Sequence, residues 1–157
     1  MDSGMDTAMN LVRTTSDHPD FRRLVAALDA DLARRDGAEH AFYHQFNGIA
    51  HLNRTVVAYV EGLAVGCGAL KEFGHDALEV KRMYTLPDFR GRGVAGQVLR
   101  ALEQWALEEG FSRCVLETGR RQPEAIALYE RYGFARIANF GPYAGVANSL
   151  CFEKKLE

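Results

Sequence analysis

Hydrophobic positions alternate with polar ones in seven stretches of the chain, and alternation of this kind predicts β-strands. Four other stretches place apolar residues three and four positions apart, which is the spacing of one helix face. The predicted strands are residues 10–15, 52–60, 63–73, 77–86, 111–118, 134–138 and 148–155. The predicted helices run from Pro19 to Gly37, over a weaker stretch at 38–47, from residues 90–96 to about Glu109, and from Pro123 to Tyr132.

The turns between these segments predict how the strands connect. Glu61-Gly62 separates two strand segments by two residues, a pattern typical of a hairpin. Gly74-His75-Asp76 leads to a third strand, so residues 52–86 read as an antiparallel meander. Helices and strands alternate afterwards. We therefore expect an α/β (α+β) fold, with a mixed, mostly antiparallel central sheet of about six to seven strands flanked by about four helices.

Length and composition fit one folded domain. The chain has 157 residues, of which 47% are hydrophobic and 25% charged, so a dominantly disordered or fibrous protein is excluded. We expect a single domain over residues 1–157, with residues 1–8 as a candidate disordered leader. Neither an apolar run of membrane-spanning length nor a secretory signal is found. The expectation is a cytoplasmic protein that does not enter the membrane.

Charge is distributed unevenly, although the net charge is only −2. Residues 1–80 hold 7 Lys/Arg and 12 Asp/Glu, whereas residues 81–136 hold 10 and 7. The middle of the chain is therefore the natural place for an anionic ligand. Its excess of positive charge is too small for a typical nucleic-acid partner.

The three cysteines, Cys67, Cys114 and Cys151, lie far apart in apolar stretches. They show no CxxC pair and no Cys/His spacing of a metal site. We expect reduced thiols in the core and no metal centre.

The segment RGRGVAG, residues 90–96, lies between a predicted strand and a predicted helix. Gly91 and Gly93 allow a tight turn with exposed backbone N–H groups, and the following helix begins with unpaired N–H donors. Arg90 and Arg92 add positive charge, so the segment predicts a pyrophosphate site, although it also fits an ordinary strand-to-helix turn. A Walker A loop is excluded because no Lys-Ser/Thr pair follows the glycines.

Two motifs in this half of the chain resemble those of one enzyme family. Arg90-x-x-Gly93-x-Ala95 resembles the R/Q-x-x-G-x-G/A signature of the GNAT superfamily of N-acetyltransferases. Residues 125–134, AIALYERYGF, are similar to its second signature, A-I-x-L-Y-x-x-x-G-F. Gln122 departs from the asparagine that this family often has there.

The resemblance implies binding of acetyl-CoA and transfer of its acetyl group to a primary amine. Main-chain groups of the strand before the loop would hold the pantetheine arm, and one N–H would face the thioester oxygen. The residues that the resemblance assigns to the co-substrate are Met83, Tyr84, Thr85, Arg90, Gly91, Arg92, Gly93, Val94, Ala95 and Gly96.

Three residues are candidates for proton transfer. An alkylammonium has a pKa of about 10.4 and must lose a proton before it attacks. Glu79, on the strand before the loop, and Glu117, at the end of the next strand, are the two candidate bases, and each also fits a surface ion pair. Tyr129 lies at the family's tyrosine position and would protonate the leaving thiolate, or would be a core aromatic instead.

Three questions remain open at this point. A non-catalytic acyl-CoA-binding module would use the same loop without the proton-transfer residues. The acceptor could be a small molecule or a peptide amine. The last strand (149–156) could pair across a homodimer or close the fold of one chain.

Overall fold

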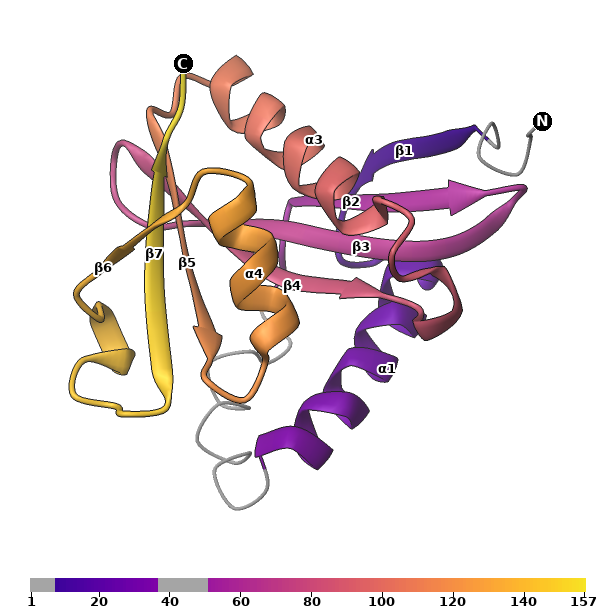
Figure 1. Cartoon of the computed structure of the whole chain (residues 1–157). Helices are drawn as coiled ribbons and strands as arrows, with labels where there is room; N and C mark the ends of the chain where they lie inside the picture. Colours follow the sequence, from indigo (N-terminus) through magenta and orange to yellow (C-terminus); the bar gives the residue numbers. More distant parts are fainter. Residues whose placement is uncertain (1–7, 37–50) are drawn as a thin grey trace.

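The computed structural model describes residues 8–36 and 51–157, which form one mixed seven-stranded sheet with helices on both faces (Figure 1). The sheet order is β1-β2-β3-β4-β5-β7-β6. The strands are β1 (Met9–Thr14), β2 (Arg54–Val60), β3 (Leu63–Glu72), β4 (Ala77–Thr85), β5 (Arg113–Gly119), β6 (Ala135–Ile137) and β7 (Ser149–Lys155). The α-helices in this part of the chain are α1 (Pro19–Asp36), α3 (Val94–Glu108) and α4 (Pro123–Arg131).

The predicted fold class is confirmed, with three α-helices in the described ranges instead of about four. The weaker helix expected at 38–47 lies outside the described residues, as does the proposed leader apart from Ala8. Two 3₁₀ turns, Pro87–Phe89 and Gly141–Tyr143, complete the structure as described.

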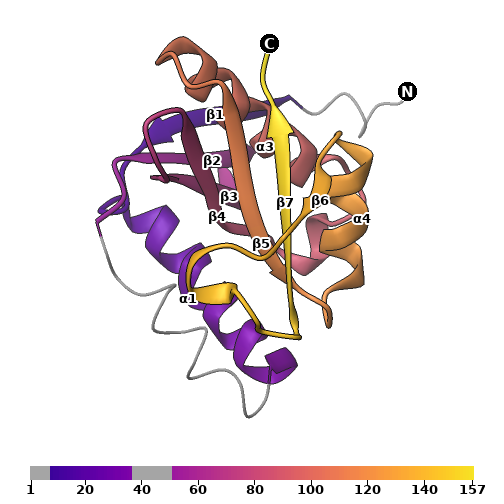
Figure 2. The same ribbon diagram turned by 90° about the vertical axis from the view of Figure 1, so that its left-hand side faces the viewer.

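Separate hydrophobic clusters lie on the two faces of the sheet. Helix α1 covers one face, where Phe21 and Leu24 pack against Val57 and Cys67 (Figure 2). Helices α3 and α4 cover the other face, whose larger cluster is centred on side chains such as Leu102. This second face permits close packing because a Cβ atom at Gly68 would lie only 2.9 Å from Leu102 Cδ1.

The sheet consists of two antiparallel parts joined by one parallel pairing. Strands β2 to β4 form the predicted meander, β1 adds to it by antiparallel pairing with β2, and β5, β7 and β6 form the second part. The parallel ladder between β4 and β5 runs from Ala77–Arg113 to Val80–Leu116. Beyond it, β4 continues to Thr85 and β5 to Gly119, and the two strands separate.

Strand β7 is an inner strand and pairs with β5 along its whole length. Residues Cys151–Glu153 also pair with β6, so this stretch cannot extend the sheet into a second copy of the chain. The C-terminal strand therefore closes the fold of one chain, and β1 and β6 form the edges of the sheet.

Candidate active site

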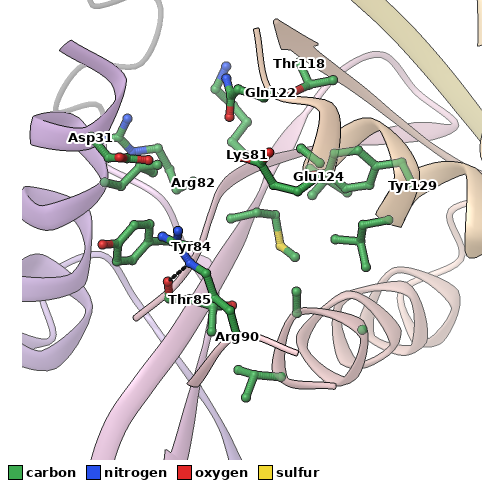
Figure 3. A pocket seen from close by; sticks show the side chains of 18 of the residues that line it. Asp31, Lys81, Arg82, Tyr84, Thr85, Arg90, Thr118, Gln122, Glu124 and Tyr129 are labelled. Carbon is green, nitrogen blue, oxygen red and sulfur yellow. Dashed lines mark hydrogen bonds between the residues drawn. The ribbon is translucent and has the colours of Figure 1, made fainter. Parts of the chain in front are cut away.

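A cavity of about 490 Å³ opens where β4 and β5 separate (Figure 3). Its walls come from α1, from β4 residues 79–85, from the loop before α3 and the first turn of α3, from the end of β5, and from α4. Nearly all the residues predicted to bind the co-substrate line this cavity: Met83, Tyr84, Thr85, Arg90, Gly91, Gly93, Val94, Ala95 and Gly96. All three predicted catalytic residues, Glu79, Glu117 and Tyr129, line it as well.

Arg92 is the predicted site residue that does not line the cavity. Its guanidinium lies 4.9 Å from the centre of the Phe89 ring, which is a cation–π contact. Arg90 and Arg92 flank Gly91 in the sequence, but their guanidiniums pack on different rings, that of Tyr84 for Arg90 and that of Phe89 for Arg92.

Arg90 is anchored at the end of β4. Its Nε donates a hydrogen bond to the Thr85 carbonyl over 2.9 Å, and its guanidinium stacks 5.4 Å from the Tyr84 ring centre (Figure 3). The side chain thus keeps further N–H donors beside the start of α3. Gly93 precedes this helix and supplies no capping side chain, which leaves the first N–H groups to a ligand or to water.

A β-bulge interrupts β4 at the cavity. Cys67 pairs with Tyr84 and Ala69 with Lys81, so Arg82 and Met83 together face the single residue Gly68. Arg82 adopts a φ of 60°, which is unusual for a residue other than glycine. The bulge takes main-chain groups of β4 out of the regular ladder at the point where the cavity needs them.

Tyr129, on α4, is 6% exposed, and its ring packs against Phe134 and Phe152. Burial raises the pKa of Tyr129, and the nearby negative charge of Glu117 raises it further. The phenol therefore keeps its proton at neutral pH. The Tyr129 hydroxyl has no hydrogen-bond partner among the described residues.

The two candidate bases have different surroundings. Glu79 Oε2 lies 3.4 Å from Lys81 Nζ, and both side chains are about nine-tenths buried. Glu117 is half-buried at the end of β5, close enough to Tyr129 to affect its pKa.

Helix α1 contributes a wall of the cavity, and the sequence did not indicate which of its residues form this wall. Leu28, Asp31, Leu32 and Arg35 line the cavity, and Arg35 reaches across to form an ion pair with Glu124 on α4. Periodicity indicates that α1 packs on the sheet, but it carries no signal for which turn faces a cavity.

Arg82 is the second wall residue that sequence reasoning missed. Only its side-chain contacts distinguish it from the surface arginines. The structure pairs Arg82 with Asp29 of α1 at 3.0 Å.

The cysteines are buried and unpaired. Burial raises the pKa of the Cys67 and Cys114 thiols to about 12, so neither is a thiolate at neutral pH. Within residues 8–36 and 51–157, no cluster of three His, Cys, Asp or Glu side chains could hold a metal ion. The helices in those ranges are all too short or too polar to cross a membrane.

Comparison with known proteins identifies relatives of the chain. The model of the Acetyltransferase (GNAT) family matches residues 18–134. An IAA acetyltransferase from Azospirillum brasilense is 42% identical over 106 residues, which cover 66% of this chain and 68% of the relative. The uncharacterized N-acetyltransferase YjgM of Escherichia coli is 48% identical over 86 residues, which cover 52% of this chain and half of that relative.

Solved structures have the same fold. A Klebsiella pneumoniae protein that carries the name acyl-CoA N-acyltransferase superposes with a TM-score of 0.80 at 30% identity, covering 95% of this chain and 98% of its own. A GNAT family acetyltransferase from Elizabethkingia anophelis, solved with acetyl-CoA bound, has a TM-score of 0.66 at 18% identity and covers 94% and 98%. The second likeness concerns the fold alone.

Proposed function

The chain belongs to the GNAT family of acetyltransferases and is an acyltransferase; on this basis we propose that it transfers the acetyl group of acetyl-CoA to a primary amine by direct attack in a ternary complex. One observation carries the proposal. A single cavity connects the glycine loop at the start of α3 with Tyr129 at the point where β4 and β5 separate. A non-catalytic acyl-CoA-binding module would not need a protonated phenol and two carboxylates in that cavity.

Acetyl-CoA supplies the acetyl thioester, and the residues present suit its shape and charge. The loop with Gly91 and Gly93 offers main-chain N–H donors at the start of a 15-residue helix, and Arg90 offers positive charge for a pyrophosphate. Main-chain groups of Met83, Tyr84 and Thr85, next to the bulge, would hold the extended arm and polarise the thioester carbonyl.

Tyr129 is proposed as the general acid. A thiolate leaving group accepts a proton from a neighbouring donor, and the raised pKa keeps Tyr129 in the donating form. The rings of Phe134 and Phe152 pack against the Tyr129 ring and hold it in place, so the hydroxyl does not need a hydrogen bond to fix its orientation.

A carboxylate is proposed to remove the proton of the ammonium acceptor, with Glu79 and Glu117 as the two candidates. Glu79 forms an ion pair with Lys81. If Glu79 accepts a proton as the base, it becomes neutral and Lys81 loses the negative charge of its partner. Glu117 lies close to Tyr129. An acceptor amine bound between these two side chains would have the proposed base on one side and the proposed acid on the other.

Two measurements test the proposal. Calorimetry should detect binding of acetyl-CoA to the purified protein, and CoA-thiol release should require an added amine. Glu79→Gln and Glu117→Gln should then be compared across pH with the same amine. The variant that lacks the base should lose most activity at low pH, where the amine is protonated, and should recover as the pH approaches the amine pKa. Failure of acetyl-CoA to bind would refute the proposed function.

A further inference from the structure

Arg82 has a half-satisfied guanidinium in the wall of the cavity. The side chain is only 6% exposed, and Nη2 donates to Asp29 Oδ2 over 3.0 Å. Nη1 is fully buried and meets no hydrogen-bond acceptor among the described residues. A buried charged donor without a partner loses its hydration and gains no hydrogen bond in return, so the site retains a strong demand for an acceptor atom.

The neighbouring carboxylates do not meet this demand. Asp31, which lies beside Arg82 in Figure 3, binds Arg34 and Arg35 through its two oxygens. Glu79 pairs with Lys81, whose own side chain is only 8% exposed. The cavity wall from Lys81 to Arg82 therefore holds two buried cations and lacks one acceptor atom for them.

The location separates this demand from the co-substrate phosphates. Arg82 faces α1, on the side of the sheet opposite α3. Thr85, where the chain turns towards the glycine loop, lies three residues further along β4, beyond the bulge. A ligand anion at Arg82 would therefore belong to the second substrate and lie beside the α1 wall.

We propose that Arg82 binds a carboxylate of the acyl acceptor, and that the acceptor is a small amino acid-type compound with both an amine and a carboxylate. The inference rests on the proposed function and names its substrate class. Asp29 holds the planar guanidinium through Nη2, and a carboxylate oxygen that packs into the Arg82 wall would supply the acceptor that Nη1 lacks. Lys81 lies next to Arg82 in the sequence and in the cavity wall. The substrate ammonium then faces the acidic groups of the same cavity, Glu79 and Glu117.

The test compares the free L-amino acids with their carboxamides as acceptors, using CoA-thiol release. Each amide keeps the amine and the side chain but loses the negative charge, and kcat/KM is calculated for the neutral amine to remove the difference in amine pKa. We expect at least one amino acid to exceed its amide by about tenfold or more. In Arg82→Met this ratio should fall to near unity, mainly through a higher KM for the acid.

Control variants keep the result interpretable. Arg82→Lys retains the charge without the forked donors and should retain part of the preference. Arg34→Gln also removes one positive charge, but from a side chain of α1 that is 71% exposed and lies outside the cavity lining. This variant should leave the ratio of acid to amide unchanged. Circular dichroism and acetyl-CoA calorimetry on each variant show whether the fold and the donor site are intact.

The outcomes separate the two hypotheses. If the wild-type protein binds acetyl-CoA but uses amides and acids equally well, or accepts only amines without a carboxylate, the role of Arg82 is refuted and the acetyltransferase function stands. Equal losses for acid and amide in Arg82→Met would refute it as well. If acetyl-CoA does not bind, the proposed function itself fails.

Discussion

Replacing Tyr129 by Phe removes one oxygen atom from the cavity and leaves the packing of the ring unchanged. The ring centroids of Phe134 and Phe152 lie 5.8 Å and 6.4 Å from that of Tyr129, and phenylalanine makes the same contacts. If the hydroxyl protonates the leaving thiolate, Tyr129→Phe should lower kcat by ~10²–10⁴-fold, or about 3–5 kcal/mol of transition-state stabilisation. The KM for acetyl-CoA should change little.

The effect on stability should be much smaller. The hydroxyl has no partner among the described residues, so its loss should cost about 1 kcal/mol or less. A domain with roughly 5–15 kcal/mol of stability stays almost entirely folded after such a loss. A fall of two or more orders of magnitude in kcat therefore cannot come from unfolding.

The assay is CoA-thiol release at saturating acetyl-CoA, combined with urea unfolding of the same samples. Tyr59→Phe is the matched control. Its hydroxyl donates to Asp20 Oδ2 over 2.6 Å on the α1 face, outside the cavity lining. This control should lose stability and keep its kcat. If Tyr129→Phe retained wild-type kcat, or if Tyr59→Phe lost as much activity, the general-acid assignment would be wrong.

Three further predictions concern two glycines, Gly68 and Gly93, and the ion pair between Arg54 and Glu109. Gly68→Ala should destabilise the protein by about 1–3 kcal/mol in urea unfolding, because the new Cβ would lie 2.5 Å from Met83 Sδ; unchanged stability would mean that the bulge yields freely. Gly93→Ala forces a side chain into a φ of 82°, so it should cost about 1 kcal/mol and weaken acetyl-CoA binding in calorimetry, and equal affinity would argue against the loop as the phosphate site. The hydrogen bond from Arg54 lowers the pKa of Glu109, so its stabilisation is present above the unfolded carboxyl pKa of about 4.3 and is lost as pH falls through the lower folded value. Glu109→Gln should therefore show a shallower loss of stability than wild type in unfolding measured from pH 6 to about 3, and parallel curves would contradict this.

The sequence predicted most of the secondary structure because the signals are local. The turn at Glu61-Gly62 has positive φ angles at both residues, 51° and 81°, as a two-residue hairpin requires. The strand predicted at 63–73 ends at Glu72, and the helix predicted to end near Glu109 ends at Glu108. Alternation and apolar spacing involve only residues that are close in the sequence, so they predict strands and helices before the fold is known.

The walls of the cavity could not be predicted in the same way. Arg82 has a backbone conformation that favours glycine or asparagine, so no propensity indicates the bulge there. Its contact with Asp29 joins residues 53 positions apart, and the cavity wall to which it belongs exists only after α1 packs on the sheet. The loop residues could be predicted because a motif marks them, although the motif could not distinguish Arg92, which does not line the cavity, from Arg90, which does.

The four-residue parallel ladder between β4 and β5 also bears on the order in which the protein assembles. Strands β2 to β4 are joined by short turns, whereas β4 can pair with β5 only after the chain has passed through α3. The cavity lies at this late junction, so we expect it to be absent from any intermediate in which only the meander has formed. A ligand that spans the junction contacts both parts of the sheet and should slow their separation. The ligand-bound enzyme should therefore resist proteolysis better than the free enzyme.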